Sequence, residues 1–211
     1  MAVHVRTFVV GPIETNCYLV IDDRSQNAVV VDPGDTCATL EAALGEVTLT
    51  DILLTHTHFD HIGGVNRLVE LTGARVWAHR LEADWLGDPT RNLSAAMEEY
   101  TPLVRVPRPS VVLCGGEETH LVGQSLRVAH APGHTPGHVI YVLGDIAFVG
   151  DVIFRGSVGR TDFPGGDSQT LLESIESQVL TLPAQTRLLP GHGPTTTVGN
   201  ERQHNPFVAA R

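Results

Sequence analysis

One short segment, residues 55–61, constrains what this chain can fold into more than any other feature. Its sequence, Thr-His-Thr-His-Phe-Asp-His, places the imidazoles of His56, His58 and His61 and the carboxylate of Asp60 close together. Imidazole and carboxylate groups are ligands that Zn²⁺, Fe and Mn²⁺ accept, and core packing gives no reason to gather them. The fold must therefore present this segment where a metal ion can bind.

The segment follows an apolar run at 52–54 and precedes an amphipathic run, so it is expected in a loop at the end of a strand. Three other candidate ligands have the same context, because His134, Asp151 and His192 each follow an apolar run and a glycine-containing turn. Glycine permits the tight backbone path that such a turn requires. We therefore expect four distant loops to meet at one edge of the sheets.

Seven candidate ligands are too many for one tetrahedral zinc ion, which takes four. The set is His56, His58, Asp60, His61, His134, Asp151 and His192. Two divalent cations suit the number better, and if Asp151 bridges them each cation receives three further ligands. Water held between two cations ionises near neutral pH instead of near about 15.7, which yields a hydroxide nucleophile. The sequence therefore predicts a metal-dependent hydrolase that needs no serine, cysteine or lysine nucleophile.

Short apolar runs typical of strands alternate with amphipathic runs typical of helices. The expected strands are 3–10, 17–21, 28–31, 51–55, 75–78, 119–122, 125–130, 138–143, 146–149 and 187–189. The expected helices are 36–44, 62–71, a weaker one at 81–86, and one that begins at 167 or 168. Because the strands form two groups interleaved with helices, we expect two sheets packed face to face with helices outside, in a single α/β domain spanning 1–211.

Composition limits the partners. The net charge of −10 argues against binding to nucleic acid or to an anionic membrane, both of which favour clustered positive charge. No apolar run approaches the roughly 20 residues needed to cross a bilayer, and the first residues lack the pattern of a signal peptide. We expect a cytoplasmic enzyme that acts on a small molecule, and assembly into a homo-oligomer is left open.

Four motifs in order along the chain resemble those of the metallo-β-lactamase superfamily. They are Thr-His-Thr-His-Phe-Asp-His-Ile-Gly-Gly at 55–64, Pro-Gly-His-Thr-Pro-Gly-His at 132–138, Gly-Asp at 150–151 and Pro-Gly-His-Gly at 190–193. Within that superfamily the chain is most similar to the short type II glyoxalases, or hydroxyacylglutathione hydrolases. The resemblance implies a four-layer αββα sandwich of two mixed β-sheets flanked by helices, with the site at one sheet edge.

The resemblance also implies roles for the seven residues. His56, His58 and His134 would hold one metal, Asp60, His61 and His192 the other, and Asp151 would bridge, so that Asp60 and Asp151 also serve catalysis. Zinc is the first expectation for both cations, with iron and manganese as alternatives. The implied reaction is attack of a metal-bridging hydroxide on a glutathione-type thioester such as S-lactoylglutathione, which releases a hydroxy acid and a thiol.

Two other functions stay open at this point. The segment 159–163, Gly-Arg-Thr-Asp-Phe, also resembles the related persulfide dioxygenases, which use one iron, and a non-catalytic metal-binding protein is the third reading. Arg155 and Arg160 are candidates to bind an anionic substrate, because a guanidinium pairs bidentately with a carboxylate. The alternative for Arg160 is a structural pair with Asp162.

Overall fold

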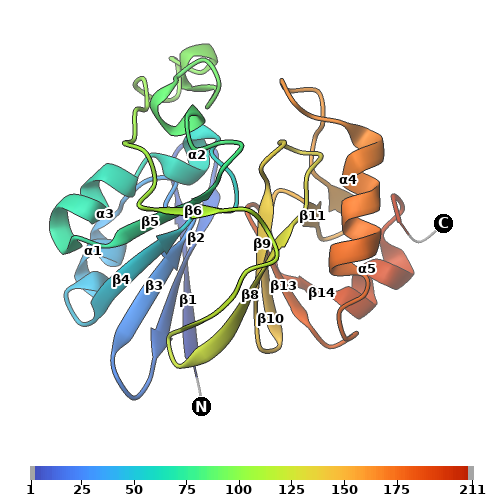
Figure 1. Ribbon diagram of the computed structural model, residues 1–211, viewed down its shortest axis with the longest axis horizontal. Coiled ribbons are helices and arrows are strands. Elements are labelled where there is room, and N and C mark those ends of the chain that lie inside the picture. The colour runs from blue at the N-terminus through green and yellow to red at the C-terminus, as the bar shows by residue number, and fades with distance from the viewer. Residues whose placement is uncertain (1–2, 209–211) are drawn as a thin grey trace.

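Buried strands dominate the fold, and their composition explains why. In β2 (Thr15–Asp22) all eight residues are buried, because one face of the sheet meets a second sheet and the other face meets helices. The computed structural model describes residues 3–208 and has helices on both outer faces of two stacked sheets (Figure 1). The predicted four-layer αββα sandwich is therefore confirmed. The predicted single domain, 1–211, includes residues 1, 2 and 209–211, which lie outside the described part of the chain.

The first sheet contains six strands in the order β1-β2-β3-β4-β5-β6. Besides β2 they are β1 (Val3–Val10), β3 (Asn27–Val31), β4 (Thr48–Leu53), β5 (Arg75–His79) and β6 (Val111–Leu113). The strands β1 to β3 pair antiparallel, whereas β3 to β6 pair parallel. Helices α1 (Ala38–Leu44) and α3 (Val65–Thr72) cover the outer face of this sheet (Figure 1).

The second sheet also contains six strands, in the order β14-β13-β10-β9-β8-β7. They are β7 (Glu118–Leu121), β8 (Gln124–His130), β9 (Val139–Leu143), β10 (Ile146–Gly150), β13 (Arg187–Pro190) and β14 (Thr196–Thr197). Its outer face carries α4 (Ser168–Ser174), which continues into the π-helical turn η3 (Ile175–Val179), and α5 (Val198–His204) (Figure 1). A small hairpin, β11 (Ile153–Phe154) and β12 (Ser157–Val158), follows β10.

Three apolar clusters hold the layers together. One joins the first sheet to α1 and α3 and includes Leu40, Ile52 and Leu68. The second fills the space between the sheets, and the third joins the second sheet to α4 and η3. Burial of apolar area at roughly 25 cal/mol per Å² makes these clusters the main favourable contribution to folding. Among residues 3–208, no helix has the length and apolar character needed to cross a membrane.

Strand direction determines where the site lies. The parallel strands β3, β4 and β5 end at the same edge of the first sheet. In the second sheet β8 and β10 are both antiparallel to β9, and β10 is parallel to β13, so these three strands also share a direction. The loops that follow six strands therefore meet at one edge of the sandwich, as ligand sites do in α/β folds.

Two predicted helices differ from the structure. The expected helix at 62–71 is wrong in its start, because α2 (Phe59–Ile62) and α3 are separated by Gly63 and Gly64. The backbone N–H of Gly64 donates to the carbonyl of Pro33 at 2.8 Å, so this turn belongs to a loop–loop contact instead of a helix. The expected helix at 81–86 is also wrong, since it is a series of turns followed by the 3₁₀ turn η1 (Trp85–Gly87).

Other elements escaped prediction altogether. The proline-rich stretch 88–110 is irregular apart from the 3₁₀ turn η2 (Ser94–Ala96). The strands β6, β11, β12 and β14 have two or three residues each, which is too short for a hydrophobic period to show. The helix α5 buries only Val198 and Glu201, so its apolar face is too narrow to produce an amphipathic pattern.

The cap of α4 gives a first test of the fold. Asp167 accepts a hydrogen bond from the backbone N–H of Thr170 at 2.7 Å, and its own N–H donates to the carbonyl of Gly133 in the loop before His134. We expect Asp167→Ala to lower the free energy of unfolding by about 1 kcal/mol, the usual value of such a cap. Urea unfolding followed by circular dichroism measures it. The exposed helical change Ser177→Ala is the control, and equal stabilities of the two variants would contradict the assignment.

Candidate metal centre

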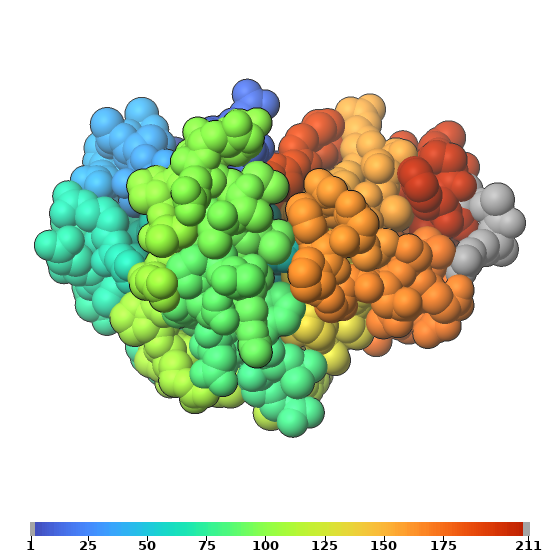
Figure 2. All heavy atoms as spheres, turned by 90° about the horizontal axis from the view of Figure 1, so that it is seen from above, coloured from blue at the N-terminus to red at the C-terminus, as the bar shows by residue number. Residues whose placement is uncertain are grey.

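The seven predicted ligands all lie at the edge where the six strands end. His56 to His61 follow β4, His134 follows β8, Asp151 follows β10 directly, and His192 follows β13. Figure 2 shows this face of the molecule, where the green segment before β6 and the orange segment around α4 leave a hollow between them. The sequence-distant groups are thus brought together at one edge of the sandwich.

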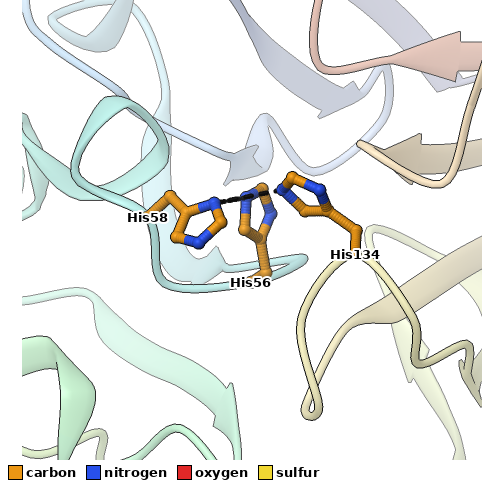
Figure 3. Close-up of side chains that lie close together, drawn as sticks. All are labelled: His56, His58 and His134. Carbon is orange, nitrogen blue, oxygen red and sulfur yellow. Dashed lines mark hydrogen bonds between the residues drawn. The ribbon is translucent and has the colours of Figure 1, made fainter. Parts of the chain in front are cut away.

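His56, His58 and His134 form the first cluster, drawn in Figure 3. The Nε2 of His56 lies 3.1 Å from the Nδ1 of His58, and the Nε2 of His134 lies 3.0 Å from that same atom. All three residues are buried. Three imidazole nitrogens that approach one point can coordinate one cation through their lone pairs.

Asp60, His61 and His192 form the second cluster. The Oδ2 of Asp60 is 3.1 Å from the Nε2 of His192 and 3.4 Å from the Nε2 of His61. The His61 side chain is completely buried, whereas the His192 side chain is 28 % exposed. This cluster offers two imidazoles and a carboxylate, a ligand set that zinc, iron and manganese all accept.

Asp151 lies between the two clusters. Its Oδ2 is 3.7 Å from the Nε2 of His134 in the first cluster and 3.7 Å from the Nε2 of His192 in the second, while its Oδ1 is 3.5 Å from the Nε2 of His61. With His56 and His61 it forms a third group of possible ligands. A single carboxylate thus reaches both clusters, which is the geometry a bridging ligand requires.

Two glycines make room for this carboxylate. A Cβ on Gly191 would lie 2.3 Å from the Oδ1 of Asp151 and 2.6 Å from the Cε1 of His61. Gly150 has a φ of +46°, and a Cβ there would lie 2.3 Å from the Oγ1 of Thr55. Both positions exclude larger residues, because the backbone passes against two ligand side chains at Gly191 and against Thr55 and His138 at Gly150.

The two clusters differ in charge. Burial, and then the neighbouring imidazole of His134, lower the pKa of His58 to about 3, and burial with the surrounding histidines holds the pKa of His56 well below its usual range. These rings are therefore neutral and keep a lone pair for a metal. For His61 burial acts in the same direction, but Asp60, Asp151 and Asp32 outweigh it and raise its pKa well above 6.5. The second cluster thus carries an excess of carboxylate that favours cations.

The donor set fits a pair of cations. The Oδ1 of Asp151 and the Nε2 of His61 are fully buried and have no hydrogen-bond partner within residues 3–208. Buried polar atoms of this kind are rare in folded proteins and need an explanation. The far nitrogens are oriented as in metal-bound histidines: the Nδ1 of His134 lies 2.7 Å from the carbonyl of Arg160, and the Nδ1 of His61 lies 3.0 Å from Asp32.

Asp32 is a site residue that the sequence reasoning missed. It follows β3, is buried and has a φ of +51°. Its Oδ1 accepts a hydrogen bond from the backbone N–H of Thr55 at 2.8 Å, and its Oδ2 accepts from the Oγ1 of Thr55 at 2.7 Å. Asp32 stands directly after a predicted strand, but in Asp-Pro-Gly the turn residues follow the carboxylate, whereas Gly150 precedes Asp151, so the pattern that singled out Asp151 is absent here.

Other predicted positions lie around the clusters. His138 is buried, stacks on His56 with ring centroids 4.9 Å apart, and accepts a hydrogen bond from the backbone N–H of Asp151. Arg160 pairs with Asp162 through two contacts of 2.7 Å and lies over the ring of Phe163, which in turn contacts His58 edge-on. Arg155 is exposed and lines an open pocket.

The family model of the metallo-beta-lactamase superfamily matches residues 10–192. The curated relatives include a probable metallo-hydrolase, YqgX, from Bacillus subtilis, with 38% identity over 96% of each chain. They also include the hydroxyacylglutathione hydrolase GloC from Haemophilus influenzae, with 34% identity over 96% of each chain.

Solved structures are similar over nearly the whole chain. The BLEG-1 B3 metallo-beta-lactamase has a TM-score of 0.92 and 38% identity, covering 97% of this chain and 99% of its own. TTHA1623, crystallised in a di-iron-bound form, has a TM-score of 0.82 and 39% identity, covering 97% of this chain and 100% of its own. ETHE1 from Myxococcus xanthus has a TM-score of 0.77 and 29% identity, covering 99% of this chain and 85% of its own. By its ordered motifs, its fold and these matches, the chain belongs to the metallo-beta-lactamase superfamily.

Proposed function

We propose that this protein is a hydrolase with two divalent cations that cleaves a small glutathione-type thioester. The observation that carries the proposal is the position of Asp151, whose carboxylate lies within 3.7 Å of imidazoles from both clusters. A protein that used one cation would have no need for Asp60, His61 and His192 to converge on that carboxylate. Zinc is our first expectation for the cations, with iron and manganese as alternatives.

Bound cations would supply an ionised water and would polarise the carbonyl group of the substrate. The five histidines, Asp60 and Asp151 would hold the cations at the edge where the six strands end. Asp60 is oriented by the Oγ1 of Thr15, which donates to it at 3.3 Å, and can accept a hydrogen bond from the attacking water. Asp32 and the carbonyl of Arg160 fix the rings of His61 and His134, so that little reorganisation is needed during the reaction.

The choice of thioester has support from the relatives. GloC is named a hydroxyacylglutathione hydrolase and matches this chain over 96% of its own length. The identity of 34% leaves room for a different acyl group or thiol. We therefore propose thioester hydrolysis as the reaction, with S-lactoylglutathione as the first substrate to test.

Two observations favour second candidates. The resemblance of segment 159–163 to the persulfide dioxygenases supports sulfur oxidation with a single iron, and the similarity to the BLEG-1 B3 metallo-beta-lactamase at 38% identity supports lactam hydrolysis. Sulfur oxidation ranks lower because it leaves the second cluster without a function. Lactam hydrolysis uses the same metal chemistry, so only a substrate comparison separates it from thioester hydrolysis.

A substrate panel tests the proposal. Protein loaded in turn with zinc, manganese or iron should release free thiol from S-lactoylglutathione, detected with a thiol reagent. Glutathione persulfide, with oxygen consumption as the readout, and a chromogenic β-lactam are the comparison substrates. Inertness towards a set of thioesters with every metal would refute the proposal, and oxygen uptake with the persulfide would favour the iron reading.

The role of Asp151 has its own test. We expect Asp151→Asn to lower kcat for the thioester by roughly 10²–10³-fold, because several kcal/mol of stabilisation depend on the cations and each 1.36 kcal/mol is a factor of ten. Metal content should fall below two ions per chain. Asp51→Asn is a matched control, since Asp51 is also buried but binds Trp77 and Arg75 instead of the clusters. Wild-type activity in Asp151→Asn would exclude a bridging role.

The proposed anion contact is tested at Arg155. The guanidinium is exposed and forms no ion pair among residues 3–208, and it follows Phe154, whose ring lies 6.3 Å from that of His192. We expect Arg155→Ala to raise KM for an anionic thioester about threefold to tenfold with kcat unchanged, as for loss of uniform binding. Arg160→Ala tests the second candidate, with Arg24→Ala as the control. Equal KM values in all of them would show that neither arginine binds substrate.

A further inference from the structure

We propose that Glu82 is a positioning residue for the first cluster, and that its carboxylate sets the spacing between the loop of His56 and His58 and the loop of His134. This inference depends on the metal centre and not on the identity of the substrate. Glu82 follows β5, the neighbour of the strand that precedes His56. It is completely buried.

The carboxylate of Glu82 joins two metal-binding loops. Its Oε2 accepts hydrogen bonds from the backbone N–H of Thr57 at 2.9 Å and from the Oγ1 of Thr57 at 3.0 Å. Its Oε1 accepts from the backbone N–H of Gly137 at 2.7 Å. Thr57 stands between two ligands in the sequence, and Gly137 belongs to the turn that presents His134. One side chain therefore fixes both sides of the first cluster.

Glu82 is tightly packed against the loop of His134. A Cβ on Gly137 would lie 2.9 Å from both the Cγ and the Oε1 of Glu82. The same loops meet again where the N–H of Val139 donates to the carbonyl of Thr55 at 2.8 Å. Between these two attachments the Nδ1 of His58 and the Nε2 of His134 are held 3.0 Å apart. A shift at Glu82 would change that separation first.

The surroundings of Glu82 suit a side chain that accepts hydrogen bonds through both of its terminal atoms. Burial raises the pKa of Glu82, while hydrogen bonds from these loops oppose that change. No ion pair within residues 3–208 includes this residue. Both backbone groups that face it are N–H donors, one on each oxygen. A glutamine would have to turn its amide NH₂ towards one of them, which leaves two donors facing each other.

Glu82→Gln tests the proposal through metal binding, with no substrate present. Residues that orient metal ligands typically change metal affinity by about 10–100-fold when lost. We expect this loss for one of the two Zn²⁺ ions, measured by competition with a chromophoric chelator, and less than about threefold change for the other. After dialysis against the chelator the variant should retain about one ion per chain where the wild type retains two.

Glu201→Gln is the matched control. Glu201 is also buried and accepts hydrogen bonds from Gly156, Asn200 and Asn205, but none of its partners belongs to the clusters. Both variants should unfold more easily, and only Glu82→Gln should lose Zn²⁺ affinity. Unchanged affinity in Glu82→Gln, or an equal loss of both ions in the two variants, would overturn the proposal.

Thr57→Val keeps the proposal testable if Glu82→Gln fails to fold. It removes one of the three hydrogen bonds and keeps the backbone donor, so the expected loss of affinity at the same single ion is about threefold to tenfold. Unchanged affinity for both ions in Thr57→Val would count against the proposal. Zn²⁺ binding with no thioester cleavage in the wild type would refute the proposed substrate and leave the role of Glu82 standing.

Discussion

The structure is organised around buried carboxylates that have no arginine side chain to pair with. Asp60 and Asp151 form ion-pair contacts only with histidines within residues 3–208, and Glu82 forms none. Burying a carboxylate without compensation is costly, and a metal ion is one of the few partners that removes the cost. Three of the carboxylates, Asp32, Asp60 and Asp151, face His61 and raise its pKa. Bound cations would balance the charge of these groups.

The direction of the strands brings these groups to one edge of the fold. Three adjacent parallel strands, β3, β4 and β5, are followed in turn by Asp32, by the histidine-rich segment and by Glu82. The carboxylates of Asp32 and Glu82 accept hydrogen bonds from the backbone of the histidine-rich segment, at Thr55 and Thr57 respectively. Two buried carboxylates therefore hold the loop of His56 and His58 from its two neighbouring strands. Such rigidity lets histidines keep their geometry before a metal arrives.

Much of this could be predicted from the sequence. Two stacked sheets with helices outside followed from the alternation of apolar and amphipathic runs, and the family resemblance implied the αββα sandwich. The convergence of His134, Asp151 and His192 on residues 56–61 followed from their places after strands. Asp32 and Glu82 escaped because each is a single carboxylate without a ligand pattern, and its importance depends on contacts with distant loops. The apolar positions of 81–86 suit a helix, but the segment forms turns, and the buried side chain of Glu82 accepts a hydrogen bond from the distant Gly137.

The account's central claim is that the seven residues hold two cations with Asp151 between them. Anomalous diffraction from crystals grown with Zn²⁺ tests it most directly. Two peaks should appear, one bound by His56, His58 and His134 and the other by Asp60, His61 and His192, with an oxygen of Asp151 on each. A single peak at the first cluster, with the second cluster free of metal at saturating Zn²⁺, would contradict the claim.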